Sequence, residues 1–410
     1  MEGAGGDQPI HFNQRDVKLL LKYPLFSAGA MVIMLVLVIA LLGSFIRPDA
    51  SQHASRQNQS LSKLPPFSSV SFLKVRMNKP KSSNGLRKRI KEGGIENDFI
   101  YYPYEDLQVI ENEIKIIFKK SSFSFLLADV VYPLDGLTLR SLKSSESKNF
   151  NFIDLDNNGI TINSEGLEQK VLNDHIVRKT FWFGTDALGR DVLSRLMAGS
   201  AISLSVGFFS VCVSILIGLV VGLLAGYYGG WVDRILNWNM NLFWSVPAIL
   251  LVVSVTIALG TGTQALIVGI ALVLWVEMAQ VVRNIVQSIR LKDFVLALRL
   301  MGLSHLTILF RHILPNLIGP IAVLASTSFA EAIMLEAGLS FLGIGIQPPQ
   351  PSWGNMIRDS YGYIISGDSA FLAIIPSVSL IVLILSFVFV SDGLKQMNDL
   401  VYNQSQRGTV

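Results

Sequence analysis

Three carboxylates stand in apolar stretches where a charge is costly. Glu277, Glu331 and Glu336 each lie within or near the end of a long hydrophobic segment, and an ionised side chain at the centre of a bilayer costs at least about 2.5–3.5 kcal/mol. We expect Glu331 and Glu336 to line a translocation path or to make polar contacts between helices. For Glu277 and Glu336, which lie near the expected ends of their segments, the alternative is a side chain that reaches the interface.

A second candidate site is the segment DLDNNGITINSE, residues 154–165, which satisfies the spacing of a calcium-binding EF-hand loop. Its potential ligands are Asp154, Asp156, Asn158 and Glu165. The flanking residues FNFI and ITIN favour strands over the paired helices of an EF-hand, and an Asn-Gly turn at 158–159 serves a β-hairpin without any metal. The hairpin is the favoured interpretation, and the calcium site is the alternative.

Familiar enzyme motifs are absent from the sequence. The chain has no GxxxxGK[ST], HExxH, CxxC or GxSxG, and its single cysteine, Cys212, lies in an apolar stretch. His305 and His312 are seven residues apart and lack the carboxylate or thiolate support that a metal site needs. We predict no enzyme active site and no cofactor, and without a P-loop the chain cannot hold ATP phosphates by itself.

Composition places the chain in a lipid bilayer. Half of the 410 residues are hydrophobic, only 16% are charged, and the mean hydropathy is +0.47, which is far from an ordinary soluble domain. A helix needs about 20 apolar residues to cross a hydrocarbon core of about 30 Å. Six segments qualify, and we expect an all-α polytopic membrane protein with six transmembrane helices at residues 26–46, 202–226, 242–259, 264–282, 317–337 and 371–390.

Basic residues predict the orientation of these helices. Arg15, Lys18 and Lys22 precede the first apolar segment, and five further Lys and Arg residues lie between positions 283 and 311. Cytoplasmic loops carry the excess of Lys and Arg in membrane proteins. We therefore expect both regions, and both termini of the chain, to be cytoplasmic.

The polar region between the first two apolar segments is large enough to form a small domain. Runs rich in β-branched and aromatic residues, such as DFIYYPY and NEIKIIF, indicate strands. We expect an inserted, extracytoplasmic and mostly β domain. The predicted organisation is a cytoplasmic N-terminus (1–25), a first transmembrane helix (26–46), the insert (47–180), a transmembrane core (181–395) and a cytoplasmic tail (396–410).

The stretch DFVLALRLMGLSHLTILFRHILPN, residues 293–316, predicts two short helices in a cytoplasmic loop. Asp293 is the expected N-cap, Gly302 the left-handed stop, Ser304 the cap of the second helix and Pro315 its end. An apolar face on such a loop is explained by docking into a groove on a separate motor protein. A loop that lies at the membrane interface and a DNA-reading helix-turn-helix are the alternatives.

The same stretch resembles the loop through which binding-protein-dependent ABC importer permeases contact their ATPase subunits. Ala297, Gly302 and Pro315 match a family pattern of Glu-Ala-Ala, three residues, Gly, nine residues and Ile-x-Leu-Pro. The Glu, the second Ala and the Ile of that pattern are replaced by Leu296, Leu298 and His312. These replacements predict a partner ATPase with a more apolar groove or a less typical coupling geometry.

Three further stretches are similar to the second permease of the dipeptide, oligopeptide and nickel importers. They are FGTDALGRDVLSRLMAGSAISLSVGF (183–208), AGYYGGWVDRILNW (225–238) and EAGLSFLGIGIQPPQPSWGNMI (336–357). The resemblance covers about residues 181–395 and implies one N-terminal helix followed by a five-helix core. It also implies a bacterial-type inner membrane, a homologous second permease, two cytoplasmic P-loop ATPases and an extracytoplasmic solute-binding protein.

Under this resemblance the chain is a permease subunit for peptides or a related small solute. Its coupling loop is residues 283–316, and the expected ATPase-coupling residues are Phe294, Ala297, Leu298, Met301, Gly302, Ser304 and Pro315. Two rival functions are an ion-coupled secondary transporter, in which the intramembrane glutamates carry protons, and a membrane-anchored scaffold whose insert binds an outside partner. Neither rival needs the coupling loop, and no nucleic-acid partner is expected.

Overall fold

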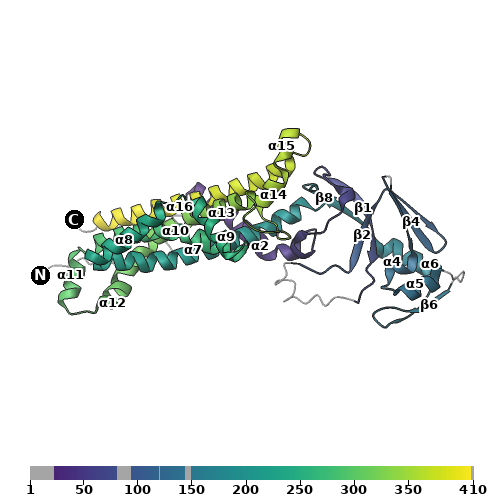
Figure 1. The fold of residues 1–410 in the computed structure, drawn as a ribbon, viewed down its shortest axis with the longest axis horizontal. Helices are drawn as coiled ribbons and strands as arrows, with labels where there is room; N and C mark the ends of the chain where they lie inside the picture. Colours follow the sequence, from purple (N-terminus) through teal and green to yellow (C-terminus); the bar gives the residue numbers. More distant parts are fainter. Residues whose placement is uncertain (1–22, 81–93, 120, 144–148, 408–410) are drawn as a thin grey trace. The chain divides into compact units, whose positions relative to one another are not determined.

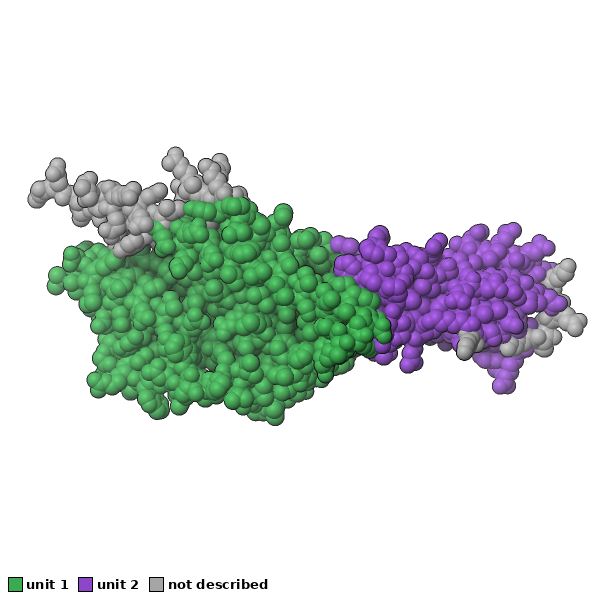
Figure 2. Space-filling model, turned by 90° about the horizontal axis from the view of Figure 1, so that it is seen from above, with its two compact units in different colours: residues 1–43, 196–410 green, residues 44–195 purple. Residues whose placement is uncertain are grey.

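The computed structural model describes residues 23–80, 94–119, 121–143 and 149–407 (Figure 1). The chain divides into two compact units (Figure 2): unit 1 contains Met1–Gly43 and Leu196–Val410, and unit 2 contains Ser44–Arg195. The predicted insert lies within unit 2. Most of the predicted cytoplasmic N-terminus and the last three residues of the predicted tail lie outside the described residues.

Unit 1 is a bundle of long helices, which Figure 1 shows running side by side. They are α2 (Pro24–Ile46), α7 (Val192–Tyr228), α8 (Gly230–Trp244), α9 (Ala248–Leu259), α10 (Thr263–Ile289), α13 (Ile318–Phe341) and α16 (Phe371–Arg407). The short helices α11 (Asp293–Leu300) and α12 (His305–Thr307) lie at one end of the bundle, and α14 (Trp353–Ser360) and α15 (Gly362–Ser366) lie at the other (Figure 1).

Five helical runs among the described residues are long and apolar enough to cross a membrane, and a sixth crossing exists if the bent pair α8–α9 forms one span. The predicted single helix over 242–259 is wrong, because the chain bends by 88° between α8 and α9. Pro247 precedes α9 and disfavours helical backbone at the residue before it. With 12 residues, α9 is about 18 Å long, too short to cross the core alone.

The predicted helix end at Pro315 is also wrong. From His305 to Phe341 the chain forms one helical run, which passes through a π-helix (Ile308–Ile313) and a 3-10 turn (Leu314–Leu317) before α13. Proline is tolerated in the first turn of a helical segment, where its missing N–H is not needed. The Asn316 side chain donates a 2.7 Å hydrogen bond to the His312 carbonyl, so this carbonyl keeps a partner at the irregular turn.

A seam of glycines on α7 packs against α10. A Cβ added at Gly218 would lie 2.6 Å from Met278 Cβ, and one added at Gly222 would lie 2.6 Å from the Ala279 carbonyl oxygen. Gly226 lies four residues after Gly222, and a Cβ added there would lie 2.7 Å from Val286 Cβ. Small residues four apart let membrane helices approach closely, and this close contact leads into the buried apolar cluster beneath α11.

Unit 2 contains all the strands of the described chain. One sheet has the order β2-β1-β8, from β2 (Phe99–Tyr104), β1 (Ser68–Arg76) and β8 (Ile176–Phe181), and a second has the order β3-β4-β5, from β3 (Asp106–Ile110), β4 (Glu113–Phe118) and β5 (Ser121–Leu126). Both sheets are antiparallel. Unit 2 also includes the short helices α4 (Leu127–Val131), α5 (Gly136–Lys143) and α6 (Ser164–Lys170), so it is a mixed domain.

The core of unit 2 follows from the alternation of residue types along its strands. In β4, Ile114, Ile116 and Phe118 are buried, while Glu113 and Lys115 are exposed, as a strand with one covered face requires. The buried isoleucines contact α4 and α6 residues such as Leu127 and Leu167 in one apolar cluster. The strands that the sequence indicates at DFIYYPY and NEIKIIF are therefore confirmed.

Residues 149–163 form the predicted β-hairpin. β6 (Asn149–Ile153) and β7 (Gly159–Asn163) are antiparallel, and Ile153 lies opposite Gly159. The prediction of a tight Asn-Gly turn is wrong, because Gly159 already belongs to β7 and the left-handed residue is Asn157, with φ 63°. Asparagine tolerates this conformation better than most residues, which suits the longer five-residue turn.

The candidate calcium ligands are divided between this turn and the next helix. Oδ1 of Asp154 accepts hydrogen bonds from the backbone N–H groups of Asp156 (3.0 Å) and Asn158 (2.8 Å). Glu165 lies beyond the hairpin, in the first turn of α6. The carboxylate of Asp154 thus holds the turn together with two backbone hydrogen bonds between Asp154, Asn157 and Asn158, and a calcium site at these residues stays a prediction.

Candidate coupling surface and intramembrane cavity

The knob, defined as residues 293–307, contains α11, a tight turn and α12. Lys292, with extended backbone at φ −71° and ψ 146°, is the N-cap of α11, and its carbonyl accepts from the N–H groups of Val295 (3.0 Å) and Leu296 (3.3 Å). The predicted N-cap, Asp293, is instead the first helical residue. Its carboxylate lies where the helix dipole favours a negative charge.

Gly302 ends α11 as predicted. Its φ is +78°, its N–H donates to the Arg299 carbonyl (3.0 Å), and the N–H of Leu303 donates to the Leu298 carbonyl (3.2 Å). This pair of bonds is a Schellman motif, which requires a left-handed residue at this position. No atom lies within 4 Å of a Cβ added at Gly302, so a side chain there costs about 1 kcal/mol or more through backbone strain alone.

Ser304 caps α12, as the sequence predicts. Its Oγ accepts a 3.2 Å hydrogen bond from the Thr307 N–H, the geometry expected of a serine N-cap. Two caps in succession, Gly302 and Ser304, therefore fix the angle at which the chain leaves α11 and enters α12.

One face of the knob packs onto the bundle and the other is open to solvent. Val295 is fully buried, while Phe294, Leu298 and Leu303 are partly buried against the cluster at the ends of α7 and α10. On the open face, Leu300 is 90% exposed and Met301 is 72% exposed. Large apolar side chains that are this exposed on a short capped helix are typical of a surface that contacts a protein or a membrane.

The predicted coupling residues divide between these faces. Ala297, Met301, Gly302 and Ser304 are exposed, whereas Phe294, Leu298 and Pro315 are partly buried. The predicted coupling residues omit two exposed leucines, Leu300 and Leu306, and Leu296, which replaces the Glu of the family pattern, is exposed as well. Leu296 and Leu300 are four residues apart, a spacing that places them on one helix face, so the periodicity of α11 contains a signal for a second apolar face.

Tyr227, the penultimate residue of α7, contacts both helices of the knob and the residue that follows α10. The ring is buried, its hydroxyl lies 2.8 Å from His305 Nδ1 in α12, and the guanidinium of Arg299 in α11 lies 4.9 Å from the ring centroid. Arg290, which follows α10, donates a 3.0 Å hydrogen bond to the Tyr227 carbonyl. Tyr227 therefore connects α7 to α11 and α12 through its side chain, and to the residue after α10 through its backbone carbonyl.

A cavity of about 410 Å³ lies in the bundle beside the bend between α8 and α9. Its walls are mostly apolar and include Phe243, Pro247 and Leu251, and it receives two carboxylates, Glu277 from α10 and Glu331 from α13. The structure thus brings Glu331 and Glu277 to one cavity. The break in the helix at Pro247 contributes one wall of this cavity.

Glu336 does not line that cavity. It is fully buried on α13, where one carboxylate oxygen accepts from Ser203 Oγ of α7 and the other from Ser340 Oγ, both at 2.8 Å. The alternative in which Glu336 reaches the membrane interface is wrong, because its side chain is fully buried and accepts hydrogen bonds from two hydroxyl groups. The arrangement joins α7 to α13 and satisfies a buried acid group, as buried polar groups require.

Comparison with known proteins decides the family. The family described as "Binding-protein-dependent transport system inner membrane component" matches residues 218–399. The dipeptide transport system permease protein DppC of Alkalihalophilus pseudofirmus is 38% identical over 218 residues, which cover 53% of this chain and 71% of that protein. This chain belongs to the ABC importer permease family.

Two further proteins are similar to this permease. The glutathione transport system permease protein GsiD of Pectobacterium atrosepticum is 38% identical over 218 residues, covering 53% of the permease and 72% of GsiD. A structure of the MetNI methionine ABC transporter in an inward-facing conformation is 23% identical, with a TM-score of 0.41, and covers 50% of the permease and 96% of that chain. The assignment rests on the family match and on the permease relatives.

The contacts of Tyr227 predict a graded loss of stability in the permease. Tyr227→Phe keeps the ring and removes only the hydroxyl that meets His305, so we expect a loss of about 1 kcal/mol. Tyr227→Ala also removes a buried aromatic ring from the cluster beneath the knob, so we expect a loss of about 3–5 kcal/mol. Thermal unfolding of the purified permease measures both changes, and equal midpoints for the two variants would contradict this account of Tyr227.

Proposed function

We propose that this permease forms half of the translocation pathway of an ATP-driven importer for peptides or a related small solute, and that its knob docks into a cytoplasmic ATPase. The observation that carries the proposal is the open apolar face of the knob, where Leu300 and Met301 are 90% and 72% exposed. Such a surface is costly in water and is stabilised when a partner buries it.

The distribution of charge supports a cytoplasmic position for the knob. Arg283, Arg290, Lys292, Arg299 and Arg311 lie in or beside the coupling loop, at the end of the bundle that carries α11 (Figure 1). The opposite end has α14, with one basic residue, Arg358. By the positive-inside rule, the knob end of the bundle faces the cytoplasm.

The insert then belongs on the other side of the membrane. It leaves unit 1 after Gly43 and returns at Leu196. A Cβ added at Gly43 would lie 3.7 Å from the Met197 carbonyl oxygen, and Leu196 accepts a 2.9 Å hydrogen bond from the indole of Trp353 in α14. Both connections therefore lie at the α14 end of the bundle, which supports an extracytoplasmic insert and cytoplasmic termini.

Coupling follows from the packing beneath the knob. Closure of two P-loop ATPases pulls on α11 and α12, and the contacts of Tyr227 transmit this displacement to α7 and α10. Because these helices are closely packed along the glycine seam, they move together as rigid bodies, which is the usual mode of such transitions. A homologous second permease completes the pathway, and an extracytoplasmic solute-binding protein delivers the solute.

The intramembrane cavity is the proposed site of passage. Glu277 and Glu331 give its wall two acceptors for hydrogen bonds from a polar solute, within a mostly apolar lining of the kind found at small-molecule sites. The relatives named above are permeases of dipeptide and glutathione transport systems, which supports a peptide or a related small solute as the cargo.

The deciding experiment compares energy sources for uptake. The permease, its partner permease, the ATPases and the binding protein are reconstituted in vesicles, and uptake of a labelled dipeptide is measured. We expect uptake that requires ATP and persists when a protonophore collapses the proton gradient. Uptake driven by a proton gradient without ATP would instead support an ion-coupled transporter in which Glu331 carries the proton.

A further inference from the structure

Unit 2 contains a cavity that the transport cycle described above does not use. Its volume is about 490 Å³, within the range of small-molecule sites. Its walls come from β1, β2 and β8, from the loop after α2 and from the turn before α7. Much of this lining is apolar and aromatic, contributed by Leu61, Phe72, Phe99, Phe181 and Trp182.

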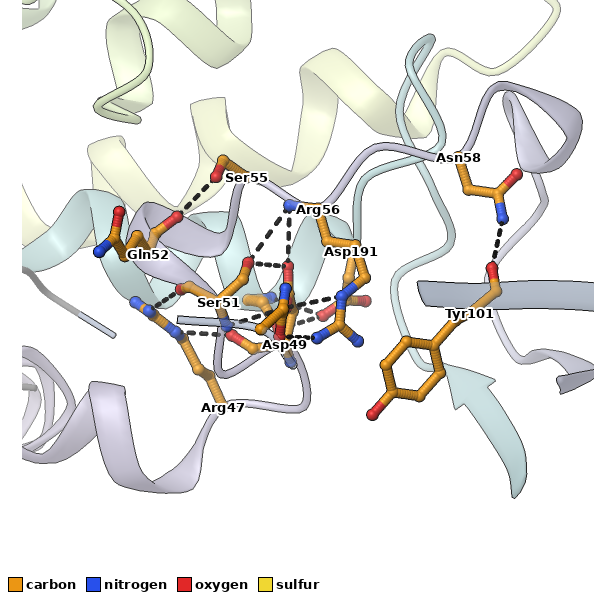
Figure 3. Close-up of polar contacts among 11 residues, drawn as sticks. Arg47, Asp49, Ser51, Gln52, Ser55, Arg56, Asn58, Tyr101 and Asp191 are labelled. Atoms are coloured by element: carbon orange, nitrogen blue, oxygen red, sulfur yellow. Dashed lines mark hydrogen bonds and ion pairs between the residues drawn. The ribbon is translucent and has the colours of Figure 1, made fainter. Parts of the chain in front are cut away.

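Two cations meet at one aromatic ring in this cavity. The guanidinium carbon of Arg56 and the ammonium of Lys179 each lie 4.1 Å from the centroid of the Tyr101 ring. Figure 3 shows Arg56 between the carboxylate of Asp49 and this ring. Arg56 and Lys179 thus place two positive charges beside the Tyr101 ring in a mostly apolar cavity.

Two carboxylates also line the cavity, but local donors occupy them. Asp49 accepts from the N–H (3.0 Å) and the hydroxyl (2.8 Å) of Ser51 (Figure 3). Asp191 accepts from the N–H of Ser194 at 2.9 Å and also from the Ser194 hydroxyl. These acids are therefore used to fold the loop and to cap α7.

The guanidinium of Arg56, in contrast, keeps an unused donor. Its Nη2 donates to Asn97 Oδ1, but among the described residues its buried Nε has no hydrogen-bond acceptor. The ion pair of Arg56 Nε with Asp49 Oδ1, at 3.8 Å, is longer than a hydrogen bond. Leaving the buried Nε of a guanidinium without an acceptor is costly, and a bound anion would remove that cost.

We propose that this cavity binds a small amphipathic carboxylate, whose carboxylate group is held by Arg56 and Lys179 and whose apolar body lies against Phe72, Phe181 and Trp182. The inference concerns unit 2 alone and does not depend on ATPase coupling. The two acids offset the two bases in formal charge, so the site favours a monoanion over a phosphate dianion. The volume of about 490 Å³ favours a small molecule over a segment of a partner protein.

The site is held in shape before any ligand arrives. Arg47 donates to the backbone carbonyls of Asp49 (2.7 Å) and Ser51 (Figure 3). The N–H of Asn58 donates to the Leu188 carbonyl at 3.1 Å, and a Cβ on Gly189 would lie 1.8 Å from the Asn58 carbonyl oxygen. Preorganised walls reduce the entropy lost on binding.

Binding should weaken above neutral pH. Burial, and then the neighbouring guanidinium of Arg56, lowers the pKa of Lys179 from 10.5 to about 8. The other charged groups that act on Lys179 are Lys74, Asp49 and Asp191. A carboxylate ligand needs the protonated ammonium, so its affinity falls as pH rises through about 8.

The test uses N-acetyl-leucine as the probe and the full chain in lipid nanodiscs. Ligand-observed NMR gives its dissociation constant alongside those of N-acetyl-leucinamide, which lacks the charge, and acetate, which lacks the apolar body. We expect N-acetyl-leucine to bind at least about tenfold more tightly than either analogue. We expect Lys179→Met to weaken its binding about tenfold, and Lys115→Met, an exposed lysine on β4, to leave it unchanged.

Lys179→Arg separates the role of the charge from a folding defect. It keeps a cation that does not titrate below pH 12, so N-acetyl-leucine should still bind and its affinity should no longer fall above pH 8. Three results would each overturn the proposal: no binding of N-acetyl-leucine, equal binding of the acid and its amide, or the same affinity in Lys179→Met and Lys115→Met.

Discussion

Leu300→Asp is expected to uncouple the permease from its ATPase without disturbing the fold. Leu300 is 90% exposed at the end of α11, so the substitution removes no contact within the permease. In the complex, the new carboxylate would have to enter an apolar groove without a partner, and removal of an anchor residue costs about 2 kcal/mol or more at interface hot spots. We therefore expect ATPase affinity to fall about thirtyfold or more, with a parallel loss of ATP-driven uptake.

Ile365→Asp is the matched control for Leu300→Asp. Ile365 is 86% exposed on α15, at the end of the bundle opposite the knob (Figure 1). Both variants add one charge to an exposed apolar position, so effects on expression and membrane insertion should be similar. An equal loss of ATPase affinity in the two variants would show that the knob is not the docking surface.

Gly222→Leu should cause a large loss of stability. The Cβ of the new side chain would lie 2.6 Å from the Ala279 carbonyl oxygen and 2.7 Å from Val282 Cβ. A backbone carbonyl in the middle of α10 cannot turn aside, so α7 and α10 must separate along the whole glycine seam. Overpacking commonly costs 1–3 kcal/mol, and we expect about 3 kcal/mol or more here, with little monodisperse protein recovered in detergent.

The control for this substitution is Gly338→Leu. Gly338 also lies in a helix, α13, but no atom lies within 4 Å of a Cβ added there. Leucine has a higher helix propensity than glycine, so this variant should be at least as stable as the wild type. If Gly222→Leu and Gly338→Leu gave the same thermal midpoint, close packing of α7 on α10 would not be what stabilises the bundle.

The local geometry of the knob could be predicted from residue types because it depends on neighbours in sequence. Gly302 is needed for its left-handed backbone and Ser304 for its capping hydroxyl, and both appear where the spacing places them. Which face of α11 packs against the bundle was less predictable. The apolar residues of α11 itself lie on every side of the helix, so the sequence does not tell which side is covered. Tertiary packing decides that Val295 is buried and Leu300 is exposed.

Features that depend on distant segments could not be predicted. Hydropathy averaged over 242–259 conceals the bend at Pro247, because most residues of this segment on both sides of the proline are apolar. The sequence shows that Glu336 lies near the end of an apolar segment. It does not show that the side chain accepts a hydrogen bond from Ser203, because Ser203 is 133 residues away. The cavity of unit 2 likewise joins Arg56, Tyr101 and Lys179, whose proximity only the sheet order creates.

The most direct test of the central claim is site-specific cross-linking from the knob. The chain has one cysteine, Cys212, so Leu300→Cys in a Cys212→Ser background gives a single reactive thiol at the tip of α11. A short thiol-to-amine cross-linker is added to native membranes, and the product is identified by mass spectrometry. The account predicts a cross-link to a P-loop ATPase that Ile365→Cys in the same background does not form. Two results from an intact permease would contradict the docking of the knob. The thiol at position 300 could form no cross-link to an ATPase, or it could cross-link to the ATPase only as often as the thiol at position 365.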